Sequence, residues 1–183
     1  MFYKQLLGNI DGGDVLDVGC GSGQFTSILV NSLASFNSIT GIDVDEEVLK
    51  NARESFPGKD IVFQTASSHN LPFNDNSFDM AVISKALHHL ENPERGLNEM
   101  YRVLKPGGLF LLIVDIHAKP TTTEPQTLAW NLISVYFPQY KILEEKHLER
   151  SVKNKIYTNS RKSKPVSNEK IQSGVLKVKL QKV

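Results

Sequence analysis

The sequence predicts an α/β fold in which helices cover both faces of one doubly wound, mostly parallel sheet. Residues 14–18 and 109–114 are apolar runs with little polar alternation, which is typical of strands buried on both sides. Residues 25–33 and 48–56 carry apolar side chains at helical spacing and follow expected strands. Glycines separate the first strand from the first of these helices, where the chain must turn sharply.

The expected strands of the parallel part of the sheet are 14–18, 38–43, 61–65, 80–83 and 109–114. A short helix over 2–10 is expected to precede the first strand. Asp45 is expected to cap the helix after the second strand. Asn92, followed by Pro93 at the first helical position, is expected to cap the helix that ends at residues 105–108.

Beyond residue 116 the pattern is weaker. A helix is expected over 128–137, and the last two strands are expected at 142–143 and 175–180. Residues 153–173 contain too few apolar side chains to pack, so we expect a mobile connection there. The whole chain, 1–183, is therefore expected to form a single domain with a core over 1–116 and a C-terminal part over 117–183.

Composition sets the broad class. The chain has 183 residues, 40% of them hydrophobic, and a formal net charge of +1, which predicts a soluble globular protein with a sizeable core. No apolar run reaches membrane-spanning length, and residues 1–7 lack a signal-peptide pattern. Cys20 is the only cysteine, so no internal disulfide can form. These features predict a cytoplasmic location.

The charge is unevenly distributed. Residues 141–183 carry twelve Lys or Arg against four Glu, a net charge of +8, so the first 140 residues carry −7. Two interpretations remain open. The basic segment is either a solvated tail or a surface that attracts an anionic partner such as a nucleic acid, a coenzyme A ester or a lipid headgroup.

The turn at residues 17–23 reads Asp-Val-Gly-Cys-Gly-Ser-Gly. Its glycines let a ligand approach bare backbone at a helix N-terminus. The spacing differs from the Gly-x-Gly-x-x-Gly of dinucleotide sites, and Asp17 would repel a pyrophosphate. An acid at this point favours a ligand with an amino or sulfonium group instead.

Further motifs follow this turn in one order: Gly-Ile-Asp at 41–43, Leu-Pro-Phe at 71–73, Phe-Asp at 78–79, His-His-Leu at 88–90 and Arg-Val-Leu-Lys-Pro-Gly-Gly at 102–108. Together they resemble the S-adenosylmethionine-dependent methyltransferases with a Rossmann-like fold, closest to the ubiquinone/menaquinone-type branch. The resemblance is strong over residues 10–116. It implies S-adenosylmethionine as cofactor and one antiparallel strand near the C-terminus.

The resemblance also implies which residues bind the cofactor: Asp17, Gly19, Cys20, Gly21, Gly23, Asp43, Val44, Ser67, Ser68 and Ser84. An acid at the tip of the second strand accepts hydrogen bonds from ribose hydroxyls, the role expected of Asp43, and Val44 is expected against the adenine. Relatives commonly have Asp-Ala where this chain has Ser67-Ser68. A serine lacks the charge assistance of an aspartate, which predicts weaker cofactor binding.

His88 and His89 lie where a transferred methyl group would point, and imidazole suits proton transfer near neutral pH. They are the candidate catalytic residues. The alternative is that one packs against the following helix and the other faces solvent. Methyl transfer depends mainly on alignment, and a base is needed only if the acceptor must lose a proton.

A small-molecule acceptor is favoured by what the chain lacks. The Pro-Pro-Tyr type of motif of nucleic-acid amino methylation is absent after the fourth strand, as are a cysteine nucleophile near the acceptor and the glutamate pair of arginine methylation. No metal-ligand spacing occurs. RNA or protein acceptors that use the basic segment remain open, and so does a cofactor-binding sensor or partner subunit without activity. The sequence leaves the acceptor atom and the oligomeric state open.

Overall fold

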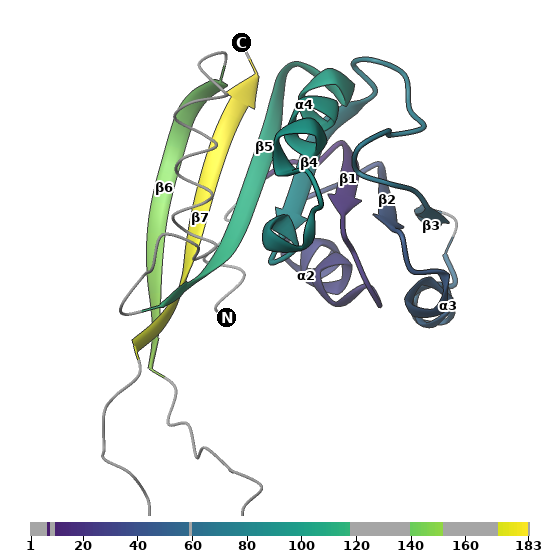
Figure 1. The fold of residues 1–183 in the computed structure, drawn as a ribbon, viewed down its shortest axis with the longest axis horizontal. Coiled ribbons are helices and arrows are strands. Elements are labelled where there is room, and N and C mark those ends of the chain that lie inside the picture. The colour runs from purple at the N-terminus through teal and green to yellow at the C-terminus, as the bar shows by residue number, and fades with distance from the viewer. Residues whose placement is uncertain (1–6, 8–9, 59, 118–139, 152–171, 183) are drawn as a thin grey trace, which may run out of the picture.

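The computed structural model describes residues 7, 10–58, 60–117, 140–151 and 172–182. Within them, seven strands form one sheet in the order β3-β2-β1-β4-β5-β7-β6 (Figure 1). The strands are β1 (Asp14–Val18), β2 (Ser38–Asp43), β3 (Ile61–Thr65), β4 (Phe78–Ser84), β5 (Leu104–His117), β6 (Tyr140–Ser151) and β7 (Gln172–Lys182). The helices are α2 (Gln24–Ser32), α3 (Glu46–Ser55), the short 3₁₀ helix η1 (Leu87–His89) and α4 (Pro93–Val103).

The strand directions confirm the predicted fold class. Strands β1 to β5 run parallel, whereas β7 is antiparallel to both β5 and β6. The chain starts at β1, moves outward through β2 to β3 and then returns to β4 on the other side of β1. In such sheets ligands bind where the strand order reverses, outside the carboxyl ends of the strands. Here that point lies between β1 and β4.

Two of the parallel strands are longer than the sequence indicated. Strand β4 begins at Phe78 rather than at Met80, because Phe78 pairs with Leu104 before a register shift. Strand β5 therefore begins at Leu104 and includes residues 105–108, which were expected to end the preceding helix. Gly107, with a φ of 77°, accommodates the irregular backbone there.

The C-terminal strands are also longer than expected and belong to the main sheet. Strand β7 pairs with β5 from Leu109↔Gln181 to His117↔Ser173, and with β6 along the whole of β6. Residues 140–151 and 172–182 are therefore strands of the main sheet rather than a tail. Gln172 and Ser173, expected in the mobile connection, are part of β7.

Several expectations fall outside the described residues: the helix over 128–137, nearly all of the helix over 2–10, and residues 153–171. Leu7 is described and is fully buried. Within the described part of the chain, no helix has the length and apolar character needed to cross a membrane.

Each face of the sheet has its own apolar core, as two-sided helix coverage requires. On one face Leu16, Ala81 and Leu112 pack with the apolar side of α4. On the other face Val15 and Val82 pack with residues of α2, including Leu29. Side chains alternate across a strand, so neighbouring residues of β1 and β4 contribute to opposite cores.

The caps predicted from the sequence are confirmed. The Asp45 carboxylate accepts hydrogen bonds from the Glu47 and Val48 N–H groups at the start of α3. The Asn92 amide oxygen accepts one from Arg95 N–H, with Pro93 in the first turn of α4. Each cap satisfies N–H groups that have no partner inside the helix, which sets where these helices begin.

Gly41 in β2 should be sensitive to substitution because its neighbours leave no room for a side chain. An added Cβ would lie 2.6 Å from Phe63 Cδ1 and 2.9 Å from Cys20 Sγ. We expect Gly41→Ala to lower the free energy of unfolding by about 1–3 kcal/mol. Gly58→Ala is the control, since within the described part of the chain no atom lies within 4 Å of its added Cβ. Urea denaturation of both variants measures the difference; equal stabilities would contradict the packing of β2 against Phe63.

Candidate functional site

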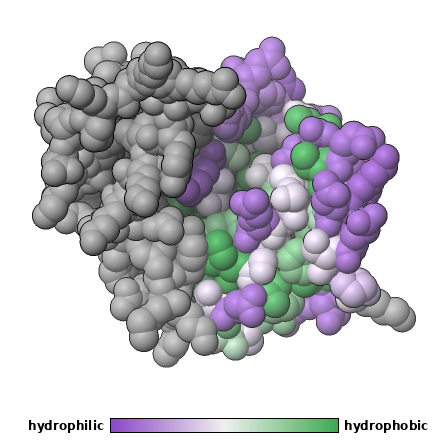
Figure 2. All heavy atoms as spheres, turned by 90° about the horizontal axis from the view of Figure 1, so that it is seen from below, coloured by the Kyte–Doolittle hydropathy of each residue, from purple (hydrophilic) through white to green (hydrophobic). Residues whose placement is uncertain are grey.

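The candidate site lies at the carboxyl ends of β1, β2 and β4. The arrows of β1, β2 and β4 point downward in Figure 1, so the view from below in Figure 2 looks onto this edge of the sheet. Hydrophobic residues reach the surface there, between hydrophilic ones (Figure 2). One of the exposed large hydrophobic residues at this edge is Val44, directly after β2, with 71% of its surface exposed.

The turn between β1 and α2 is fixed to the end of β2. The N–H groups of Gly19 and Cys20 both donate to the Ile42 carbonyl, at 2.8 and 3.0 Å. Gly23 N–H then donates to the Cys20 carbonyl at 3.0 Å, and Gly23 is the N-cap of α2. The turn is therefore a rigid element that brings the start of α2 to the end of the second strand.

The three glycines of this turn all have left-handed backbone, with φ of 70° at Gly19, 53° at Gly21 and 82° at Gly23. Two of them also avoid a clash. A Cβ on Gly19 would lie 2.6 Å from Ala86 Cβ, and one on Gly23 would lie 2.8 Å from Phe56 Cε2. Gly21 differs, because no atom of the described residues lies within 4 Å of its added Cβ. Open space therefore meets the backbone at Gly21.

The Asp43 carboxylate stands beside that open space. Its Oδ2 accepts from Gly21 N–H at 2.9 Å, and its Oδ1 accepts from Asp45 N–H at 3.1 Å. A carboxylate has about four acceptor positions. The two backbone bonds orient Asp43 and leave acceptor capacity for a pair of hydroxyl groups, such as those of a ribose.

Asp17 is more deeply buried than a carboxylate that serves only as counter-charge to a ligand. It is 1% exposed, and its Oδ2 accepts from Thr26 Oγ1 at 2.7 Å. Among the described residues, no donor reaches its other oxygen. Burial raises the pKa of Asp17 from its ordinary value of 3.8 to about 6, the Thr26 bond opposes the rise, and the Asp43 charge adds to it. An ionised Asp17 therefore has an electrostatic cost that a nearby cation would reduce.

Cys20 contributes backbone rather than its side chain. Cys20 is 6% exposed, and its Sγ lies 2.9 Å from the position of a Cβ added to Gly41. Burial, together with the charges of Asp17 and Asp43, raises the pKa of Cys20. A buried thiol with a raised pKa is a poor nucleophile.

The structure separates the two serines that follow β3. Ser67 is exposed, and its Oγ accepts from His69 N–H at 3.2 Å. Ser68 is buried and faces α4, since its Oγ lies 3.4 Å from the position of a Cβ on Gly96. The bond from Ala66 N–H to the Asp43 carbonyl, 3.0 Å, holds this segment beside the end of β2. Only Ser67 presents a side chain on the exposed side.

The segment after β4 approaches the same edge. Ser84 ends β4, and Lys85 has a left-handed φ of 58° with its N–H bonded to the Ile113 carbonyl at 2.8 Å. His88 and His89 lie on η1, and the His89 side chain is exposed. The His88 side chain is outside the description. Ala86, directly before η1, lies close to Gly19, because a Cβ added to Gly19 would contact Ala86.

Sequence reasoning missed two residues that support the site, Glu99 and Arg102. Both are on α4, and Arg102 donates to the backbone carbonyls of Leu71 and Phe73 in the segment after β3. Arg102 opens the 102–108 motif, so the sequence contained a signal. Nothing in the sequence indicated which segment it contacts.

Comparison with known proteins gives the family. Residues 16–112, just over half of the chain, match the family described as a methyltransferase domain. The chain belongs to this family. The family and fold expected from the motifs are thus confirmed.

The relatives include demethylmenaquinone methyltransferases. The protein of that name from Desulfitobacterium hafniense is 39% identical over 111 residues, 58% of this chain and 43% of the relative. The one from Listeria welshimeri is 34% identical over 130 residues, 69% of this chain and 52% of the relative. This chain therefore spans about half the length of these relatives.

Solved structures agree on the fold. An S-adenosylmethionine-dependent methyltransferase from Mesorhizobium loti superposes with a TM-score of 0.67, covering 99% of this chain and 96% of its own, at 20% sequence identity. The observed residues fit a ligand that carries a diol and a positive charge: Asp43 has acceptor capacity for a diol, Gly21 borders open space among the described residues, and Asp17 has an oxygen without a described donor.

The raised pKa of Asp17 predicts how stability depends on pH. Because the folded pKa, about 6, exceeds the ordinary 3.8, folding stability falls as pH rises from about 4 to about 6, by up to about 3 kcal/mol. Asp17→Asn keeps an acceptor for Thr26 and removes this fall. Thr26→Val, which removes the opposing hydrogen bond, should steepen it. Urea denaturation of the ligand-free proteins between pH 4 and pH 7 measures how the free energy of unfolding changes with pH. The same change in wild type and Asp17→Asn would contradict the prediction.

Proposed function

We propose that this chain binds S-adenosylmethionine and transfers its methyl group to a small-molecule acceptor. The observation that carries the proposal is the open space at Gly21 beside the Asp43 carboxylate, at the carboxyl ends of β1 and β2. Membership of the methyltransferase domain family supports it. The cofactor supplies an electrophilic methyl group on a sulfonium, so the protein mainly has to align it with the acceptor.

In this proposal each part of the edge has a separate role. Asp43 accepts hydrogen bonds from the ribose hydroxyls, and the exposed Val44 provides an apolar surface for the base. The turn from Gly19 to Gly23 offers backbone to the amino-acid part, with Asp17 as the nearby negative charge. Ser67 lies on the base side. Its hydroxyl lacks a carboxylate's charge, which favours weaker binding of the base.

The acceptor is proposed to meet the cofactor near Ser84 and η1. His89 is exposed there, and His88 and His89 are the groups proposed to hold a proton if the acceptor must lose one. The names of the relatives suggest demethylmenaquinone as a first acceptor to test. Its reduced form is a hydroxylated ring whose carbon becomes more nucleophilic when a ring hydroxyl is deprotonated.

Binding is tested with alanine variants of two glycines that both have left-handed backbone. Gly21 and Gly107 both have left-handed φ, 53° and 77°, and both have room for a Cβ. Alanine should cost each about 1–2 kcal/mol of stability. Only Gly21→Ala fills the space proposed for the ligand, so only this variant should lose affinity for S-adenosylhomocysteine in calorimetric titration. Tighter binding of NAD than of S-adenosylhomocysteine by the wild type would contradict the cofactor assignment.

Transfer is tested by incubating the protein with methyl-labelled S-adenosylmethionine and reduced demethylmenaquinone. We expect label in the ring product and none with the oxidised quinone, which lacks an electron-rich carbon. Binding without transfer to this acceptor or to a metabolite extract would instead indicate a sensor or partner subunit. Label in RNA or protein would support a macromolecular acceptor if it is lost in a variant with glutamine at five basic positions: Lys153, Lys155, Arg161, Lys162 and Lys164.

A further inference from the structure

The β3–β4 loop, residues 66–77, connects the edge strand β3 to the central strand β4 without a helix. Its backbone N–H and C=O groups therefore lack the partners that a helix would supply, and buried groups of this kind must find others. Many of these partners come from α4. Asn76 N–H and Ser77 N–H donate to the carbonyls of Arg102 and Val103, at 3.1 and 2.7 Å.

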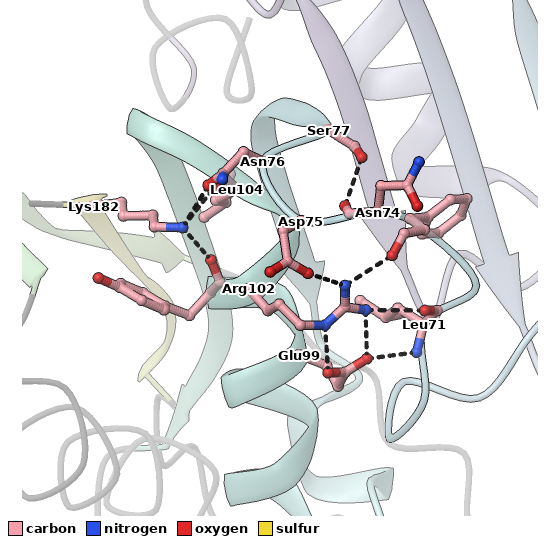
Figure 3. A network of polar contacts seen from close by, with 11 residues as sticks. Leu71, Asn74, Asp75, Asn76, Ser77, Glu99, Arg102, Leu104 and Lys182 are labelled. Carbon is pink, nitrogen blue, oxygen red and sulfur yellow. Dashed lines mark hydrogen bonds and ion pairs between the residues drawn. The ribbon is translucent and has the colours of Figure 1, made fainter.

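Arg102 makes the largest contribution (Figure 3). Its Nε donates to Glu99 Oε1 at 2.8 Å. Its Nη1 donates to the Phe73 carbonyl at 2.8 Å and to Asp75 Oδ1 at 2.7 Å. Its Nη2 donates to the Leu71 carbonyl at 3.0 Å and to Glu99 Oε2 at 2.8 Å. A guanidinium has five N–H donors, and all five are used.

Glu99 also forms a hydrogen bond with the β3–β4 loop. Its Oε2 also accepts from Leu71 N–H at 2.8 Å, so the Glu99–Arg102 pair holds both backbone groups of Leu71. The two side chains are 19% and 31% exposed, and Leu71 is 4% exposed. The hydrogen bond from Arg102 keeps the pKa of Glu99 below its ordinary value. Glu99 and Arg102 are therefore both charged at neutral pH.

The bonds from Glu99 and Arg102 to Leu71 lie next to the segment proposed to face the nucleoside. Ala66 N–H is bonded to the Asp43 carbonyl, and Leu71 is bonded to Glu99 and Arg102. Residues 67–70 are thus fixed at both ends. Between these anchors, His69 Nε2 accepts from Asn92 N–H at 3.1 Å. The position of Ser67 relative to Asp43 depends on both anchors.

We propose that Arg102 and Glu99 are positioning residues for nucleoside binding: they contact no ligand, and they set the place of residues 67–70 beside Asp43 by holding Leu71. This inference rests on the proposed function. It adds to that function a requirement for a planar, five-donor side chain at position 102, which lysine cannot meet.

The test uses Arg102→Lys, the near-isosteric Glu99→Gln, and Lys105→Met as matched control. Lys105 is also a cation paired with carboxylates, Asp79 at 2.8 Å and Asp14 at 3.6 Å, but it forms no hydrogen bond or ion pair with a described residue of the β3–β4 loop. Calorimetry well below the melting temperature of each variant gives the Kd of S-adenosylhomocysteine and of adenosine. In Arg102→Lys and in Glu99→Gln, both Kd values should rise about tenfold, and the factor should be the same for S-adenosylhomocysteine and adenosine. Both Kd values should stay unchanged in Lys105→Met.

A second measurement needs no ligand. Amide hydrogen exchange of residues 68–70 should accelerate in Arg102→Lys and Glu99→Gln, while exchange in β1 stays as in the wild type. Folded variants with unchanged Kd values and unchanged exchange at 68–70 would overturn the inference. If the wild type fails to bind S-adenosylhomocysteine, the proposed function fails, and the exchange measurement still decides whether the pair positions the loop.

Discussion

The candidate site depends on two hydrogen bonds to one carbonyl. Gly19 and Cys20 both donate to the Ile42 carbonyl, which joins the turn after β1 to the end of β2. The left-handed φ of Gly19, 70°, allows two successive N–H groups to point at one acceptor. The same fixed turn directs Gly21 N–H at Asp43. The ends of this parallel pair of strands form the edge at which we propose that the ligand binds, with oriented backbone on one strand and an oriented carboxylate on the other.

The electrostatics of this edge favour a ligand that brings both hydroxyls and positive charge. Asp43 is held by backbone donors and keeps acceptor capacity, whereas Asp17 is buried with a raised pKa. The Asp43 charge adds to the cost of ionising the buried Asp17, and a nearby cation would reduce that cost. Sites that perform a function often keep such a cost in the ligand-free protein because the ligand offsets it.

The β3–β4 loop, next to the same site, is held by hydrogen bonds to side chains of α4 rather than by sheet hydrogen bonds. The β3–β4 loop has no helix, so α4 replaces one, with Asn92 at its start and Arg102 at its end bonded to the loop. Lys182 near the C-terminus of β7 donates to the Tyr101 and Leu104 carbonyls at 3.0 and 2.6 Å (Figure 3). Helix α4 is thus held between the loop that faces the proposed nucleoside and the antiparallel end of the sheet.

The sequence by itself determined the five parallel strands, the caps Asp45 and Asn92, and the glycine turn, because each has a local physical cause: apolar runs, side-chain acceptors, or backbone that only glycine adopts easily. The lengths of β5, β6 and β7 were decided by pairing between distant segments, which no local pattern records. The site divides in the same way. Residues 17–23 and Asp43 could be predicted from short motifs. That Ser68 faces α4, that Asp17 is buried against Thr26, and that Arg102 holds Leu71 follow only from how helices and loops pack on the sheet.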